Sequence, residues 1–497
     1  MAKYKHGTYG EVNAVGTKTA EESQSIMVYI GTAPVHTVED GAENVNIPIL
    51  INDLAEAKKY LGYSDNWADY TLCEAMHVHL EYKGIGPLVF INVLDPKKHK
   101  ASESGNISKT PENGRVTIQA AENIILDSVA VKSGSTAKKK GIDYTIAYNS
   151  AKKTITITEV TSGALGKTAL TITYDSVDPS KVEEADVIGS TDGLGLNTGI
   201  YAIKDVYQLT TYMPSFIVCP GFSSIPAVHS AMHQNSVKIN GHWDAYMFTD
   251  LPITHNGQAV TLDTAPTLKK ANGYTCENET VSYPMAEGTD GNIYHLSVLR
   301  AANFQELLVG TDQDGIPYKS ASNTECGLIQ NLYFGEEYRG RCLDDETINE
   351  KLNKYGIASA AYVGKKWALW GAHSADYDLE NADSVNVAET NRMMLYYISN
   401  DFQERRATDV DQPLTPNDIQ SIVKSEQERI DNLIGIGALV FGEVILNADT
   451  QAQSDILNGD YSFIFNVTTT PLAKSLTAII EWTKQGLSAY YATAEAA

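Results

Sequence analysis

Apolar and polar positions alternate in two different ways along the chain, and the change between them divides it into segments. Within residues 24–100, two short apolar runs, IMVYI at 26–30 and LVFINVL at 88–94, flank two stretches with helical spacing. These stretches, at 53–62 and 68–83, place apolar residues every three or four positions and are followed by or end on a glycine. Strand, helix, helix and strand at these lengths indicate the beginning of an α/β layer.

Helical spacing disappears between residues 101 and 190. It is replaced by β-rich runs separated by turn-rich pieces such as KSGSTAKKKG and TSGALGK. Short strands at this spacing are typical of a β-sandwich or barrel. We therefore predict a β-rich surface domain inserted into the α/β domain. The runs are VTIQ from 116, NIILDSVAV from 123, DYTIAYN from 143, KTITITEV from 153 and ALTITYD from 169.

The α/β pattern returns over residues 191–375. Strands are predicted for SFIVCPG at 215–221 and AYMFTD at 245–250, with a helix at 227–237 between them. A further helix, capped by Asp344 or Asp345 and stopped by Gly356, leads into two more apolar runs. This alternation predicts a doubly wound core.

The C-terminal part combines helices with short strands. Helices are predicted at 387–406 and 415–435, the second with Pro416 in its first helical position and Gly435 at its end. Strands are expected at 438–446 and 461–468, with a short helix between them. The closing stretch SLTAIIEWTKQGLSAYY fits helical or strand spacing, and its Thr, Ile, Trp and Tyr content favours strands.

The fold class expected from these patterns is α/β and multidomain, with a doubly wound core, an inserted β-sandwich or barrel, a C-terminal α+β module and extended terminal arms. Residues 1–23 have little that could be buried in their own domain, so they are either a frayed terminus or an arm ordered on a neighbour. The predicted divisions are 1–23 (arm), 24–100 (first part of the inner α/β domain), 101–190 (insertion), 191–375 (α/β core), 376–486 (C-terminal domain) and 487–497 (arm).

Composition and charge exclude several classes of function. With 43% apolar and 20% charged residues over 497 positions, the chain is a folded globular protein with roughly three domains. Its 62 acidic and 38 basic residues give a net charge of −24, which disfavours direct binding of nucleic acid or anionic lipid. Five scattered cysteines indicate a reduced protein. Neither a signal peptide nor an apolar stretch of membrane-spanning length is expected.

Motifs for catalysis or ligand binding are weak. GALGKT at 163–168 resembles a phosphate loop, but Thr161 stands where a glycine is needed and a hairpin turn is favoured. His229 and His233, four apart on a predicted helix, could face one metal, yet no third ligand is evident nearby. No G-x-S-x-G occurs. We predict no catalytic residues, no cofactor and no metal, and a structural protein rather than an enzyme.

The order of these pieces, with several local stretches, resembles the tail sheath family of contractile phages and of related bacteriocin and injection systems. The resemblance covers nearly the whole chain. In WALWGAH, His373 stands where the family commonly has an arginine. The stretches are KHGTYGEVNA, PSFIVCPG, YHLSVLRAANFQELLVGTDQDGIPYKSASN, WALWGAH and NGDYSFIFNVTTTPLAKSLTAIIEW.

The resemblance implies a core related to subtilisin-type proteases but without their catalytic residues. It also implies stacked six-fold rings around an inner tail tube, with neighbouring sheath subunits, the tube protein, baseplate proteins and a tail terminator as partners. Contraction from a metastable extended state would drive the tube through the cell envelope for genome ejection. The expected location is the virion tail, after assembly in the bacterial cytoplasm.

Three surfaces are expected to make these contacts. Both terminal arms would add strands to sheets of adjacent subunits, because main-chain hydrogen bonds tolerate sequence change. The N-terminal arm would contribute Tyr4, His6, Tyr9, Val12 and Val15. The C-terminal arm would contribute Leu487, Ala489, Tyr490 and Tyr491. A C-terminal helix such as 418–433, acidic at Asp418, Glu426, Glu428 and Asp431, would face the inner tube.

Two other functions fit the same architecture. One is a catalytic α/β protein, such as a hydrolase with an accessory β domain, which would need a nucleophile and base that the sequence does not reveal. The other is a cell-surface or capsid-decorating protein that uses the β insertion.

Overall fold

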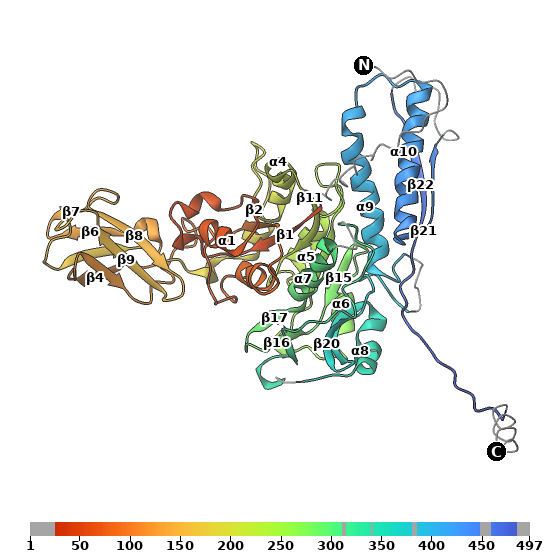
Figure 1. Ribbon diagram of the computed structural model, residues 1–497. Helices are drawn as coiled ribbons and strands as arrows, with labels where there is room; N and C mark the ends of the chain where they lie inside the picture. Colours follow the sequence, from red (N-terminus) through yellow and green to blue (C-terminus); the bar gives the residue numbers. More distant parts are fainter. Residues whose placement is uncertain (1–24, 311–314, 339–340, 380–384, 448–458, 485–497) are drawn as a thin grey trace, which may run out of the picture. The chain divides into compact units, whose positions relative to one another are not determined.

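The computed structural model describes residues 25–310, 315–338, 341–379, 385–447 and 459–484 (Figure 1). They fall into two compact units, Met1–Pro416 and Asn417–Ala497. The N-terminal arm residues and the C-terminal arm residues named above lie outside the described residues, as do positions 448–458, where a short helix was predicted.

The first unit is built on an eight-stranded sheet with the order β2-β3-β1-β11-β12-β15-β19-β20. Six strands from β3 to β19 are parallel, while β2 and β20 are antiparallel at the edges. Parallel strands are buried on both faces, which explains the unbroken apolar runs of the sequence. The strands are β1 (Ser25–Gly31), β2 (Ile49–Ile51), β3 (Leu88–Asn92), β11 (Met213–Val218), β12 (Tyr246–Asp250), β15 (Glu279–Ser282), β19 (Ile357–Val363) and β20 (Lys366–Trp370).

Alternate side chains of β1, β3, β11 and β12 enter two separate apolar clusters. Tyr29 and Phe248 belong to one cluster, and Val28 and Met247 belong to the other. The first cluster is completed by α2 (Leu72–Ala75), the π-helix η3 (Met76–Lys83) and α7 (Leu296–Val309). The second is completed by η6 (Gly199–Asp205), α4 (Val206–Thr210) and α5 (Pro226–Gln234). Helices therefore cover both faces of the sheet, as a doubly wound core requires.

Helix ends follow their capping residues. Asp53 caps α1 (Leu54–Tyr60) by accepting a hydrogen bond from the amide of Glu56 at 2.9 Å. Asp344 caps α8 (Asp345–Lys351) in the same way. The helix predicted over 68–83 begins only at Leu72, and its second half is π-wound up to Gly84, whose φ of 65° stops it.

The insertion is a separate β structure with its own core. One antiparallel sheet has the order β4-β10-β6-β7 and the other β5-β9-β8. Side chains from both sheets enclose a third apolar cluster. The GALGKT segment lies in turns between β9 and β10, not between a strand and a helix. The strands are β4 (Gly105–Lys109), β5 (Arg115–Ile118), β6 (Ala130–Ser133), β7 (Thr136–Ala137), β8 (Tyr144–Asn149), β9 (Thr154–Glu159) and β10 (Leu170–Tyr174).

Smaller elements complete the first unit. A three-stranded sheet has the order β17-β16-β18, and α3 (Glu184–Ile188) packs Val187 into the α/β core although it falls inside the predicted range 101–190. The other elements are the hairpin β13 (Thr254–His255) and β14 (Gln258–Ala259), α6 (Ala265–Ala271), β16 (Met285–Gly288), β17 (Ile293–His295), β18 (Ile329–Tyr333) and α9 (Glu389–Arg406).

The second unit consists of α10 (Pro416–Gly435) and the antiparallel pair β21 (Leu439–Leu446) and β22 (Phe463–Thr469). The strands predicted for the closing stretch are wrong for its described part, because residues 475–483 pair with no strand there. No helix in the described ranges combines the length and apolar character needed to cross a bilayer.

The insertion begins and ends at neighbouring points of the α/β domain. Lys100 bridges to Val177, and the amide of Ala101 donates to the carbonyl of Ser176 at 2.8 Å. Its loops also contact the domain: His36 lies 2.8 Å from the carbonyl of Glu122, and the Tyr70 hydroxyl donates to Asn123 at 3.2 Å. Ile125 of the insertion belongs to the first apolar cluster of the domain. The insertion is therefore a module with its own core that is joined to the domain at one end.

Replacing residues 101–176 with a short Gly-Ser linker should leave the α/β domain folded. We expect a loss of about 5 kcal/mol in the free energy of unfolding, because several hydrogen bonds of about 1 kcal/mol each and the burial of Ile125, about 2 kcal/mol, disappear. Circular dichroism and denaturant unfolding would measure this. A variant without a cooperative unfolding transition would show that the domain needs the insertion.

Candidate functional site

Helix α10 packs on strand β21 through an apolar stripe and one amide. Ile430 approaches Gly442 so closely that a Cβ at that glycine would lie 2.0 Å from Ile430 Cγ2. The Gln427 side chain donates to the Gly442 carbonyl at 3.1 Å and accepts from the Val444 amide at 2.8 Å. The Gln427 side chain therefore hydrogen-bonds to two backbone groups of β21. These bonds fix the helix against the two-stranded sheet.

The four acidic residues of the predicted tube-facing helix differ in exposure. Asp418, Glu428 and Asp431 are exposed, but Glu426 is buried at 1% exposure. Glu426 lies four residues after Ile422 and four before Ile430, so it falls on the buried face of the helix. The exposed acidic face therefore has three of the four predicted residues.

The tail after β22 carries large apolar side chains in solvent. Leu476, Ile479, Ile480 and Trp482 are 90%, 85%, 92% and 77% exposed. Apolar residues are commonly exposed singly, but four within seven positions mark an interaction segment. Sequence analysis placed the C-terminal arm at 487–497, and the apolar tail lies before it.

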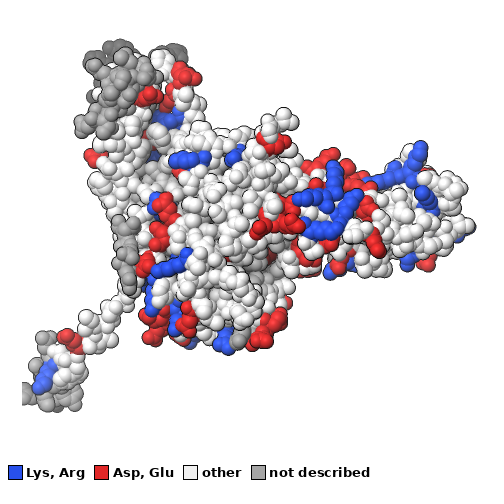
Figure 2. All heavy atoms as spheres, turned by 180° about the vertical axis from the view of Figure 1, so that it is seen from behind, with Lys and Arg blue, Asp and Glu red and all other residues white. Residues whose placement is uncertain are grey.

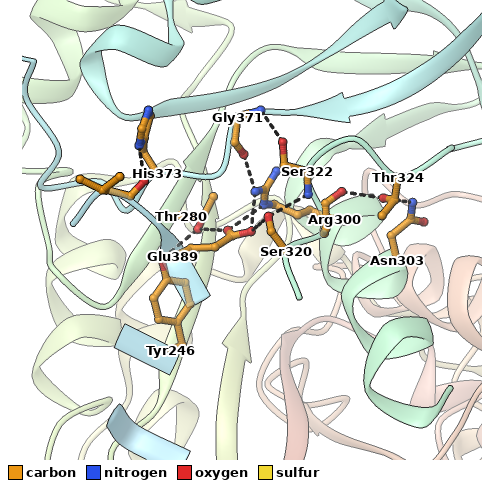
Figure 3. A network of polar contacts seen from close by, with 12 residues as sticks. Tyr246, Thr280, Arg300, Asn303, Ser320, Ser322, Thr324, Gly371, His373 and Glu389 are labelled. Carbon is orange, nitrogen blue, oxygen red and sulfur yellow. Dashed lines mark hydrogen bonds and ion pairs between the residues drawn. The ribbon is translucent and has the colours of Figure 1, made fainter. Parts of the chain in front are cut away.

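A buried ion pair forms the centre of the polar network shown in Figure 3. Arg300 on α7 and Glu389 at the start of α9 are 1% and 0% exposed. The guanidinium Nη2 and Nε lie 2.8 and 3.2 Å from the two carboxylate oxygens. Glu389 also accepts from Ser320 at 2.6 Å and from Thr280 at 2.7 Å. The carboxylate is thus fully paired, as a charge at this depth requires.

The same network joins distant parts of the first unit. Arg300 donates to the carbonyl of Gly371, which directly follows β20, and Gly371 N donates to Ser322 at 3.0 Å. Farther along α9, Asn400 exchanges two hydrogen bonds with the backbone of Asp244, at 3.0 and 2.8 Å. Helix α9 is therefore fixed at its first turn and again in its second half. This network was not predicted from the sequence. One arginine within the apolar helix LSVLRAANF could have indicated a buried ion pair.

A second buried polar cluster lies at the junction of β17 and α7. Glu74 accepts from the backbone amide of His295 at 2.6 Å and from its Nδ1 at 2.7 Å. Burial opposes protonation of His295, but Glu74 and then Asp250 more than compensate and raise its pKa to about 9. The Ser297 hydroxyl donates to Asp250 rather than to a histidine. This arrangement holds a protonated imidazole between carboxylates and does not activate the serine.

The histidines singled out as possible metal ligands point to different partners. His229 Nε2 lies 2.9 Å from a Glu279 oxygen, while His233 Nδ1 lies 3.1 Å from Asn278 Oδ1. His373, which stands at the family's arginine position, stacks on Tyr377 with ring centroids 3.6 Å apart. The two histidines of α5 therefore do not form the pair that their spacing suggested.

Charged side chains of both signs are interspersed on the face shown in Figure 2. Ion pairs near the base of the insertion include Lys100 with Asp175 at 2.8 Å and Lys140 with Asp127 at 3.1 Å. In the view of Figure 2, acidic side chains interrupt the basic ones around the middle of the face, unlike the continuous basic surface that nucleic acid binds.

Glu389→Gln should destabilise the first unit by about 3 kcal/mol, because it leaves the Arg300 charge buried without a countercharge. Denaturant unfolding would measure the loss. The matched control is Glu277→Gln, which removes a half-exposed partner of Arg392 at 2.7 Å and should cost less than about 1 kcal/mol. Equal losses in the two variants would contradict the role given to the buried pair.

His295→Gln should flatten the pH dependence of stability above neutrality. A folded pKa of about 9, raised from 6.5, gives a contribution that is complete below pH 6.5 and disappears as pH rises through 9. The contribution is about 3 kcal/mol at most. Unfolding curves from pH 6 to 10 for the parent and the variant should converge at high pH. His255→Gln, at an exposed histidine, should keep the parental profile.

Comparison with known proteins gives full-length matches. No protein-family model matches the chain. The tail sheath protein of Burkholderia phage BcepMu is 25% identical, and the alignment covers 98% of each chain.

Solved structures of contractile systems share the fold. A chain of the anti-feeding prophage baseplate has a TM-score of 0.55 and 12% identity, covering 97% of this chain and 100% of that chain. The contracted sheath complex of the PVC extracellular contractile injection system has a TM-score of 0.52 and 11% identity, covering 98% and 99%. These results confirm the family resemblance predicted from sequence: over nearly its whole length the chain is similar to a phage tail sheath protein, and it shares its fold with the two solved structures above.

Proposed function

We propose that the chain polymerises as stacked six-fold rings around an inner tail tube and contracts to drive that tube through a cell envelope. The observation that carries the proposal is the match over 98% of both chains to a phage tail sheath protein. In this proposal the protein is non-enzymatic, its core is a relative of subtilisin-type folds without their chemistry, and genome ejection is the result of contraction.

Strand addition between subunits is the proposed mode of assembly. The β21–β22 sheet has only two strands; α10 packs on it, and a further strand would extend its main-chain hydrogen bonding. The apolar tail supplies exposed side chains in a segment that forms no strand of its own. A donated strand would bury these side chains and gain main-chain hydrogen bonds at the same time. The N-terminal arm, Tyr4 to Val15, is proposed as the second donor.

The exposed acidic face of α10 is proposed to contact the tube. Asp418, Glu428 and Asp431 would contact basic groups of the tube. Glu426 is buried and is not part of this surface. Baseplate and terminator proteins are the proposed partners at the two ends of the polymer, in a virion tail assembled in the bacterial cytoplasm.

Substituting the apolar tail should abolish polymerisation without unfolding the subunit. In negative-stain electron microscopy, the parent co-expressed with its tube protein should form striated tubes, whereas the double variant L476S/I480S should remain monomeric. The control L194S/L196S removes two other exposed leucines and should still form tubes. Tubes from L476S/I480S would refute the strand-donor role. A parent that neither forms tubes nor co-purifies with the tube protein would refute the sheath function.

A further inference from the structure

Three potential metal ligands converge where β15 begins. They are His229 on α5, Cys276 in the preceding loop and Glu279, the first residue of β15. One donor atom from each, Nε2, Sγ and a carboxylate oxygen, all lie within 4.8 Å of one another. The sequence hides this convergence because His229 is 50 positions from Glu279.

The site has a buried interior and a solvent-facing side. Glu279 and His229 are 0% and 2% exposed, while Cys276 is partly exposed. The Tyr274 ring covers the imidazole at a centroid distance of 4.1 Å, and Thr249 donates to Glu279. A cation could therefore reach the three donors past Cys276 and be shielded from water on the other sides.

The donor set fits one class of metal. Zinc accepts thiolate, imidazole and carboxylate together, with bonds of about 2.0–2.3 Å. Harder ions such as Mg²⁺ and Ca²⁺ require oxygen ligands, which this site lacks in number. Donors within 4.8 Å need only small side-chain rotations to meet such an ion.

Charge balance also favours a dication. Zinc binds cysteine as the thiolate, so binding of Zn²⁺ releases the thiol proton to solvent. One dication, one thiolate, one carboxylate and a neutral imidazole sum to zero, which is the charge that a buried site tolerates best.

We propose that His229, Cys276 and Glu279 form a zinc site that ties helix α5 to the start of β15, with water as the fourth ligand. His233 is outside it, because its Nδ1 lies beside Asn278. Binding to the folded state alone would stabilise the first unit by mass action.

Cobalt substitution tests the site in the full chain purified without a polyhistidine tag and treated with a chelator. Added Co²⁺ should give the visible bands of a tetrahedral complex and a near-ultraviolet thiolate charge-transfer band, both removed by one equivalent of Zn²⁺. Cys276→Ser should lose the charge-transfer band, and His229→Gln should weaken binding at least tenfold. The matched controls Cys342→Ser, at an exposed cysteine, and His233→Gln should behave as the parent.

Thiol alkylation followed by mass spectrometry keeps the test independent of the folding of the variants. In the parent, Zn²⁺ should slow modification of Cys276 and leave Cys342 unchanged. No charge-transfer band, a band that persists in Cys276→Ser, or equal alkylation of Cys276 with and without Zn²⁺ would each overturn the proposal. The three residues would then be a buried histidine–carboxylate pair beside an ordinary thiol.

Discussion

The first unit depends on one buried ion pair between Arg300 and Glu389. Moving two charges out of water costs several kcal/mol each, and close pairing offsets this cost. Groups from α7, β15 and the segment at Ser320 pair with the Glu389 carboxylate. Arg300 also donates to the residue after β20, while its Nη1 has no partner among the described residues. Loss of any of these elements would remove a partner of a buried charge, so their packing is coupled. The network thereby makes α9 part of the core instead of a surface helix.

Much of the core was predictable because parallel strands carry their own signal. The runs at 26–30 in β1 and 88–91 in β3 are apolar at every position, since both faces of these strands are covered. Helix ends were equally predictable, because they depend on residues nearby in the sequence. The residues that set them are Asp53, Asp344 and Gly84. In contrast, the π-winding of η3 has no single-residue signature. The second unit begins at Asn417, after α9, whereas the domain predicted from sequence began at residue 376.

The candidate sites were less predictable because they join residues that are distant in sequence. Arg300 and Glu389 are 89 positions apart, and one sequence contains no information on such a pairing. Glu426 was recoverable, since its four-residue spacing from Ile422 and Ile430 already places it on the apolar stripe. Strands in the closing stretch were predicted from β propensity alone. A segment with high β propensity forms a strand only when another strand pairs with it. No strand in the described part of the chain pairs with residues 475–483.

The apolar tail has a consequence for how the monomer behaves in solution. Four uncovered hydrophobic side chains promote association with any apolar surface, whereas a net charge of −24 makes copies of the chain repel one another. Repulsion of this kind acts over about 8 Å at physiological ionic strength, so it opposes approach before the tail can make contact. In the proposed assembly, this repulsion would slow self-association of free subunits and weaken as the salt concentration rises. A basic template would neutralise it locally, so the apolar tail would make its contacts on the template before it does so in bulk solution.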